Sequence, residues 1–427
     1  MSFQQGLSGL NAASKTLEAI GNNVANSNTV GFKSSQAEFA DVFASSLSGS
    51  GGGSTQVGIG VKVSQVAQAF TQGNVTASNN PLDLAINGGG FFRVATNGTI
   101  SYSRNGQFSL DKNGFITNAG GAHLTGYTAN SNGVLSTGAP ADLQINTADL
   151  PPNQSKTVKA MLNLDSNKPP IDTVANPFKV TDPSTYTNAT SVSVFDSLGV
   201  PHVLQTFFVK TGPVAPMTGK ASWDVYGAAD DVVLKNTAFP NGKLGTLVFN
   251  TDGSIDTKNS IPAAPNLMQA PLDVTTGATT PFNVALDFTG TTQYGSTFSV
   301  NSLKQDGFTS GRLSGFNTGA DGIITGRYTN GQSTTLGQVV LANFANVNGL
   351  KPLGNNLWSE SSDSGPALVS TPNSGALGVL QSSAVEDSNV DLTAELVNMI
   401  TAQRIYQANA QTIKTQDQVL QTLVNLR

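Results

Sequence analysis

Cysteine is absent from this sequence of 427 residues, and charged residues make up only 11% of it. Without cysteine the chain has no disulfide framework, no thiolate zinc site and no cysteine nucleophile. Only two histidines are present, which also excludes an imidazole-rich metal site. The net charge of −5 is the opposite of the basic footprint of nucleic-acid binding. We therefore expect no metal, no cofactor and no nucleic-acid partner.

Long apolar runs are also missing. No stretch approaches the roughly 18 consecutive apolar residues of a membrane helix. A cleavable signal peptide has an early positive charge and then an apolar run of about 7–15 residues, whereas the first basic residue here is Lys15. We expect no lipid anchor, and if the protein is exported, a route that needs no cleavable signal.

Catalytic signatures are missing as well. The sequence contains none of the P-loop, nucleophile-elbow or zinc-protease motifs. His123 and His202 lie in strand-like segments without an adjacent nucleophile, which favours surface or structural roles. The glycine run at 88–90 leads into a strand rather than a helix, so a tight strand entry is favoured over a phosphate site. We expect no catalytic residues and no enzyme.

What is present at the N-terminus is a helical stripe. Positions 3, 7, 10, 14, 17, 21 and 24 follow an alternating spacing of four and three, which places them on one face of a helix. The apolar members are Phe3, Leu7, Leu10, Leu17 and Val24, and Ala13 and Ile20 widen the stripe. The pattern predicts a helix from about residue 3 to residue 25.

The C-terminus repeats this spacing over more than four heptads, from residue 392 to residue 424. Its apolar members are Leu392, Leu396, Met399, Tyr406, Ile413, Leu420 and Val424. Asn389 or Asp391 can cap the predicted helix, and Glu395 suits the positive end of its dipole. The spacing predicts one long helix over 392–427.

The two stripes must be covered, because a single amphipathic helix is unstable in water. One interpretation is an intramolecular two-helix stalk, and the other is packing between molecules. The outer faces carry amides and hydroxyls, among them Asn11, Asn22, Asn23, Gln403 and Gln407. A solvated coiled coil normally carries Glu and Lys there. Nearly uncharged outer faces favour helices packed on all sides in a polymer.

Between the helices the sequence is typical of antiparallel strands. Asn-Gly and Asp-Gly pairs, which favour tight hairpins, recur along it. Apolar residues alternate over 282–288, and at 100–102 and 108–110 on either side of Asn105-Gly106, where we expect a hairpin. Trp223 and Trp358 are predicted to anchor the cores of separate β regions.

These patterns predict a mainly β chain with α-helical termini that pair as a coiled coil, and nested antiparallel β domains between them. Residues 1–28 plus 388–427 form the helical domain, and 29–70 form a connecting segment with a Gly/Ser-rich linker. Residues 71–150 plus 306–387 form an inner β domain, into which an outer β domain at 151–305 is inserted. Prolines near residue 150 mark the boundary.

Four blocks of the sequence, in order, resemble the flagellar rod and hook axial protein family. The first, at 21–33, contains Asn22, Asn23, Asn26, Gly31 and Phe32, and the others lie at 79–94, 108–127 and 382–409. The resemblance covers roughly residues 1–130 and 305–427. The inserted domain carries none of these motifs.

The resemblance implies a subunit that passes through the flagellar type III export apparatus and assembles into a helical tube outside the cell. Its terminal helices line the export channel, and its β domains lie outside. The large insert favours the hook, a flexible universal joint that transmits torque from rod to filament, over the alternative, the distal rod. The implied partners are further copies of the chain and the rod, hook cap and hook–filament junction proteins.

Two further alternatives remain open. Phe39 and Phe43 fit the short Phe-based export signal that the family is said to carry, but a helical core turn at 39–43 explains them equally well. From a different class, a secreted β-sandwich adhesin with a helical stalk also fits the composition. The adhesin predicts an oligomer of fixed size, whereas the axial protein predicts a polymer that grows with concentration.

Overall fold

The computed structural model describes residues 2–42, 58–212, 220–235, 241–262 and 267–425. The chain divides into two compact units. Unit 1 comprises Met1–Thr147, Ser314–Arg327 and Ser333–Arg427, and unit 2 comprises Ala148–Leu313 and Tyr328–Gln332. Unit 1 is mainly β with a helix at each end of the chain, which confirms the predicted fold class.

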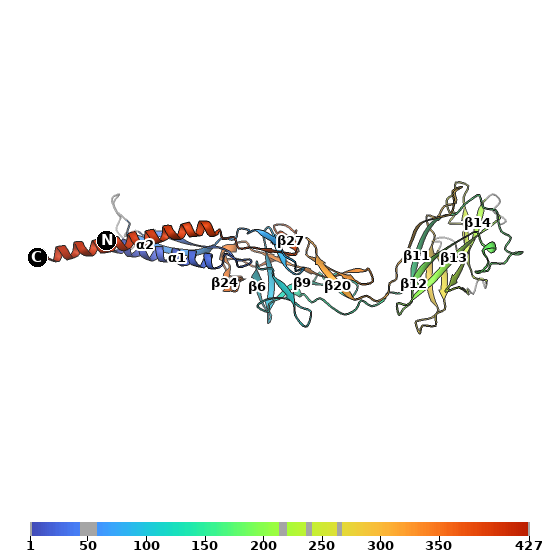
Figure 1. Cartoon of the computed structure of the whole chain (residues 1–427), viewed down its shortest axis with the longest axis horizontal. Coiled ribbons are helices and arrows are strands. Elements are labelled where there is room, and N and C mark those ends of the chain that lie inside the picture. Colours follow the sequence, from blue (N-terminus) through green and yellow to red (C-terminus); the bar gives the residue numbers. More distant parts are fainter. Residues whose placement is uncertain (1, 43–57, 213–219, 236–240, 263–266, 426–427) are drawn as a thin grey trace. The chain divides into compact units, whose positions relative to one another are not determined.

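The two helices are α1 (Ser2–Ala25) and α2 (Leu392–Asn425), and they lie side by side (Figure 1). Of the two candidate caps, Asp391 caps α2, because its carboxylate accepts the backbone N–H groups of Thr393 at 2.9 Å and Ala394 at 3.1 Å. Asn389 has a different role, described below. No helix in the described part of the chain is long and apolar enough to cross a membrane.

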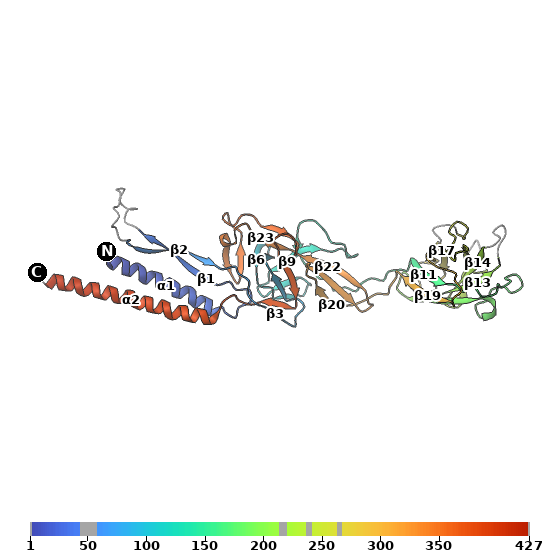
Figure 2. The same cartoon turned by 90° about the horizontal axis from the view of Figure 1, so that it is seen from above.

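After α1 the chain forms a hairpin, which the sequence analysis did not foresee. Strands β1 (Ser35–Val42) and β2 (Gly60–Gln68) pair antiparallel, with a bulge at Glu38/Phe39. Figure 2 shows the hairpin alongside α1. The helical-turn interpretation of Phe39 is wrong, since this residue lies in β1. Phe43 and the Gly/Ser-rich linker at 45–55 lie outside the described residues.

The β part of unit 1 is built from short strands and one short 3-10 helix. They are β3 (Val75–Ala77), β4 (Leu84–Asn87), β5 (Phe91–Thr96), β6 (Thr99–Ser103), β7 (Phe108–Leu110), β8 (Ile116–Asn118), β9 (His123–Thr128), β10 (Ala141–Asp142), β20 (Leu313–Thr318), β21 (Ile323–Tyr328), β22 (Ser333–Val339), β23 (Leu341–Asn343), η3 (Val347–Gly349), β24 (Lys351–Gly354), β25 (Leu357–Ser359), β26 (Leu368–Ser370), β27 (Val379–Ser382) and β28 (Ala384–Glu386). The main sheet runs β20-β21-β22-β9-β5-β6-β25-β24. Strands from both sides of the insert therefore complete one sheet.

The hairpin predicted at Asn105-Gly106 does not form. Strand β6 pairs with β5 across Asn97-Gly98, and β7 pairs with β8 instead. Gly106 is needed for another reason, because a Cβ there would lie 1.7 Å from the Leu84 carbonyl oxygen. The Asn-Gly pair was misread because close backbone approach and a tight turn both select glycine.

Trp358 anchors the core of unit 1, as predicted. Its ring makes edge contacts with Phe91 at 5.8 Å and Phe70 at 5.6 Å. Its indole N–H donates to the Gln68 side chain at 2.7 Å, which joins β25 to the end of β2. The hairpin is thereby attached to the β core as well as to α1.

The described residues of unit 2 form a β sandwich with one 3-10 helix. Its elements are β11 (Thr157–Asn163), η2 (Pro183–Thr185), β12 (Asn188–Phe195), β13 (Pro201–Thr211), β14 (Ala221–Ala229), β15 (Val232–Val233), β16 (Lys243–Phe249), β17 (Leu267–Leu272), β18 (Phe282–Asp287) and β19 (Ser299–Gln305). One sheet runs β17-β18-β11-β19, and the other runs β12-β13-β14-β15, with β16 also on β14.

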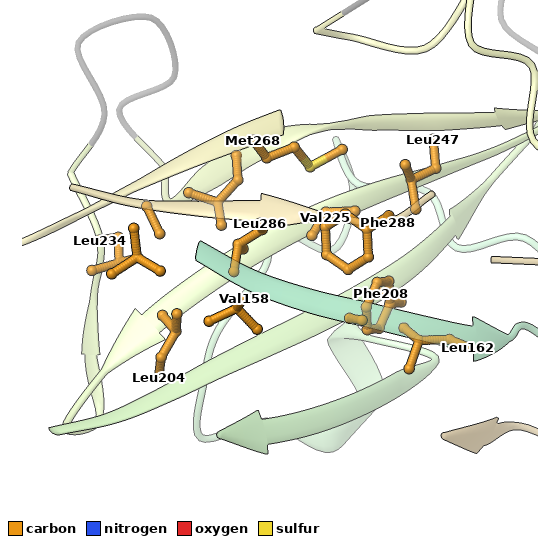
Figure 3. Packing of buried hydrophobic residues seen from close by; sticks show 14 of the residues in the cluster. Val158, Leu162, Leu204, Phe208, Val225, Leu234, Leu247, Met268, Leu286 and Phe288 are labelled. Atoms are coloured by element: carbon orange, nitrogen blue, oxygen red, sulfur yellow. The ribbon is translucent and has the colours of Figure 1, made fainter. Parts of the chain in front are cut away.

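Both sheets contribute to one apolar core (Figure 3). Val158 and Leu286 come from the first sheet, and Leu204, Phe208 and Val225 come from the second. The predicted alternation at 282–288 is confirmed, since every second residue there is buried in this core. Trp223 is fully buried in the same core and anchors it, as predicted.

Candidate assembly surface and its junction with the β domain

Helices α1 and α2 run antiparallel, and small residues let them approach closely. A Cβ added at Gly6 would lie 3.1 Å from Ile413 Cγ1, and one added at Gly9 would lie 2.6 Å from the Asn409 side-chain oxygen. Near the other end, the Asn23 amide donates to the Glu395 carboxylate at 3.0 Å. These three contacts fix the register over the whole length of α1.

The seam between the helices lies one position away from the predicted stripe. On α1 the seam follows 6, 9, 13, 16, 20 and 23, with Gly6, Ala13, Ile20 and Asn23 buried. On α2, among the side chains that the structure describes, only Ala402 is buried, at 4% exposed. The helix pair therefore closes on small side chains, and the larger apolar residues of the stripe flank the seam.

The predicted stripe residues divide accordingly into two groups. Leu10, Leu17, Val24, Met399 and Ile413 are half-buried, whereas Phe3, Leu7, Leu392, Leu396, Tyr406, Leu420 and Val424 are exposed. Pairing within one chain therefore covers only part of the apolar surface. The exposed group is the candidate assembly surface.

Asn23 is buried, although the sequence analysis placed it on the outer face. Its amide donates to the Ser35 carbonyl at 2.9 Å and to Glu395, and its side-chain oxygen accepts the Ser35 N–H at 2.8 Å. An amide suits this position because it donates and accepts at once. Asn23 thus joins the last turn of α1, the start of β1 and the first turn of α2.

The other motif residues shape the turn that follows α1. The Asn26 amide donates to the Asn22 side chain at 2.8 Å and to its carbonyl at 2.9 Å. Gly31 has a φ of +71°, and a Cβ there would lie 2.5 Å from the Asn105 backbone nitrogen. Phe32 is half-buried. Glycine is therefore required at position 31 by conformation and by space.

Immediately after this turn lies a buried ionic cluster. The Lys33 ammonium is 2.7 Å from one oxygen of the Glu386 carboxylate, and the Arg104 guanidinium is 3.2 Å from the other. Lys33 and Glu386 have fully buried side chains. Lys33 also donates to the Thr71 carbonyl at 2.7 Å, and the Gly73 N–H donates to Glu386 at 3.0 Å.

Burial lowers the pKa of Lys33 and of Arg104, and the Glu386 carboxylate opposes that shift. One carboxylate compensates two cations, so its removal leaves both without a counter-charge. Arg104 further donates to the Gly88 carbonyl at 2.8 Å. The cluster therefore connects the segment after α1 to β28, to the end of β6 and to the glycine entry of β5.

Asn389, which lies just before α2, hydrogen-bonds to the same junction. Its side-chain oxygen accepts the Ser34 N–H at 2.8 Å, and its amide donates to the Ala69 carbonyl at 2.7 Å and to the Thr71 hydroxyl at 2.8 Å. The connections at both helix bases are thus hydrogen-bonded to one another. Sequence reasoning missed Lys33 and Glu386, although a charged residue in such a charge-poor chain was a usable signal, and it considered Asn389 only as a helix cap.

The predicted export-signal residue Phe39 lies in β1 and is 39% exposed.

Both histidines have structural roles. His123 Nδ1 is 2.8 Å from the Asp142 carboxylate, and the His202 nitrogens face Asp230 at 2.7 Å and Asp196 at 3.5 Å. The described residues contain no group of three or more His, Asp or Glu that could hold a metal.

Four family models match the chain. They are the flagella basal body rod protein (residues 3–33), the flagellar hook protein FlgE/F/G D1 domain (85–161), the flagellar basal body protein FlaE D2 domain (163–308) and the flagellar basal body rod FlgEFG protein C-terminal domain (381–426). The matches in this order, on a chain with paired terminal helices, define an axial protein of the flagellar rod and hook class.

Curated relatives show to which family of this class the chain belongs. The chain is 42% identical over 432 residues to the flagellar hook protein FlgE of Salmonella typhimurium, and 31% identical over 457 residues to that of Borreliella burgdorferi, with all of this chain and 99–100% of theirs covered. It belongs to the flagellar hook protein FlgE family and is a structural subunit of the hook. The crystal structure of Helicobacter pylori hook protein FlgE2 shares the fold over 72% of this chain and 99% of its own, with a TM-score of 0.51 and 13% identity.

Proposed function

We propose that this hook subunit polymerises through its terminal helices, which form the inner layer of a flexible tube around an export channel. The observation that carries the proposal is the candidate assembly surface. Phe3, Leu7, Leu396, Tyr406 and Leu420 are each 38–54% exposed after α1 and α2 have paired. Large apolar side chains left exposed along a helix pair are typical of an interaction site. Further copies of the same chain would cover it.

The polar residues beside this surface also suit a polymer. Few of them are charged, so packing on every side buries amides and hydroxyls rather than ions. The tube would transmit torque through its packed inner layer. The outer β domains would slide past one another as the joint bends. The division into a helical domain, a connecting segment and two β domains remains part of this proposal.

The partners and the location follow from membership of the family. We expect the rod, the hook cap and the hook–filament junction proteins to contact the ends of the polymer, outside the cell. The subunit would travel unfolded through the flagellar type III export apparatus, without a cleavable signal. The absence of cysteine favours this route, since no disulfide can form in transit. The role is mechanical, and no enzymatic activity is proposed.

The proposal is tested by electron microscopy and sedimentation of the purified chain at increasing concentration. We expect hollow curved tubes whose amount grows with concentration. Leu7→Asp, on the candidate assembly surface, should abolish the tubes and leave melting of the β domains nearly unchanged, whereas Leu7→Met keeps an apolar side chain there and should preserve them. An oligomer of fixed size, or tubes formed equally well by Leu7→Asp, would contradict the proposal.

A further inference from the structure

The α1–α2 register leaves the end of α2 without a partner helix among the described residues. Gly6 lies opposite Ile413, so the start of α1 at Ser2 reaches about residue 417. Residues 418–425 of α2 therefore extend beyond α1 by about 12 Å at 1.5 Å per residue (Figure 2). We call this segment the α2 overhang.

The overhang has an apolar face and little charge. Val419, Leu420 and Val424 are 48%, 54% and 73% exposed. Leu420 and Val424 are four residues apart and share one face of the helix. No residue between 418 and 425 is ionisable. Covering this face would therefore bury apolar area without leaving a charge unpaired.

Toward the other end of the helix pair lies a groove of about 470 Å³. Its floor is α1 with Ala19 and Ile20, one wall is β1 with Phe39, and the other wall is α2 with Thr401 and Ile405. Ile405 is 50% exposed at the rim. The ionisable residue in its lining is Glu395, whose carboxylate already accepts from Asn23. The groove is thus close to neutral and partly apolar.

The groove and the overhang match in length. The α2 wall runs from Glu395 to Ile405, about 15 Å, against about 12 Å for the overhang. Their centres are separated by about 30 Å along the same helix, so one molecule cannot fill its own groove. A contact between two such different surfaces is heterologous, and heterologous contacts that do not close into a ring produce open helical polymers.

We propose that the α2 overhang of one copy docks in the groove between α1, β1 and α2 of the next copy, with Leu420 and Val424 facing the groove. The inference rests on the proposed function and specifies its contact. It makes assembly directional, because each copy offers an overhang at one end of its helix pair and a groove nearer the other. It also gives the hairpin a role as the outer wall of the groove.

The absence of cysteine permits a direct test by disulfide trapping. Thr401→Cys in the groove is combined with Val424→Cys on the overhang, and the chain is polymerised and oxidised. The two positions lie about 34 Å apart on one helix, so a disulfide can form only between copies. We expect a ladder of covalent dimers, trimers and larger species on denaturing gels.

The matched control moves the groove cysteine to Thr412, an exposed threonine of the same helix that makes the same side-chain bond to the carbonyl four residues back. We expect only monomers from Thr412→Cys with Val424→Cys. If the first pair prevents polymerisation, the two cysteines are placed on separate chains and co-assembled with unmodified chain, and a covalent dimer is then expected.

The outcomes separate the two proposals. Polymers without a ladder, or a ladder from the control pair as well, would overturn the docking and leave the proposed function standing. Failure of the unmodified chain to polymerise would contradict the proposed function itself. The Val424→Cys thiol should react fast in the dilute monomer and slowly in the polymer; slow reaction in the monomer would show that the chain's own residues cover the overhang, and would also overturn the docking.

Discussion

The Lys33 ammonium and the Glu386 carboxylate form an ion pair at 2.7 Å with both side chains fully buried, although 353 positions separate them in the sequence. The pair joins the chain leaving α1 to the strand that precedes α2. Together with Arg104 it places a single negative charge between two cations. Each of these charges is costly to bury without the others, so the two ends of the chain are held at one point.

Glu386→Gln should destabilise unit 1 by about 3–5 kcal/mol, because it leaves two buried cations uncompensated. Each unit contains one tryptophan, so Trp358 fluorescence in a Trp223→Phe background reports urea unfolding of unit 1 alone. The control is Glu18→Gln, which breaks an exposed pair with Lys15 and should cost no more than about 0.5 kcal/mol. Equal effects of the two variants would contradict this account.

Gly31→Ala should destabilise the junction by at least about 1–2 kcal/mol, since the new Cβ meets the Asn105 backbone at 2.5 Å and the φ of +71° disfavours alanine. Gly21→Ala is the matched control, because a Cβ at this helical glycine meets nothing within 4 Å. It should be neutral or stabilise α1 by up to about 1 kcal/mol. Thermal melts of both variants check the difference; a neutral Gly31→Ala would refute the steric argument.

Unit 2 should become less stable at alkaline pH because of the buried Tyr226. Burial, with the charge of Asp224 beside it, raises the pKa of Tyr226 to about 12 from the usual 10.0. Between these values the folded state keeps a proton that the unfolded chain releases, so stability falls as pH rises through this range, by on the order of 2 kcal/mol. Tyr226→Phe should flatten the fall while changing stability at pH 7 little. Trp223 fluorescence in a Trp358→Phe background measures both.

The terminal helices should be marginal before assembly. Their seam consists largely of small residues such as Gly6, Ala13 and Ala402, which bury little apolar area. We expect backbone amides of α1 and α2 to exchange with solvent much faster than those of β5 in the dilute monomer, and to become protected in the polymer. Protection of α1 equal to that of β5 in dilute solution would contradict the expectation.

Local patterns predicted much of the fold. Heptad spacing located both helices to within two residues, and alternation located β18, because period and face are properties of neighbouring residues. The same reasoning failed where glycine has two uses, since Gly106 permits close approach to Leu84 rather than a hairpin. It also missed the β1–β2 hairpin, whose strands are separated by a long Gly/Ser-rich stretch.

The sequence by itself determined that the chain has two helical ends with apolar stripes and too little charge for a solvated coiled coil. Only the tertiary structure decided which face of each helix closes on the other, because Gly6 and Gly9 let α2 approach to a distance that a larger side chain would not allow. It also brought Lys33, Arg104 and Glu386 together. Such partners, distant in sequence, are selected by the packing of whole elements, which no local period encodes.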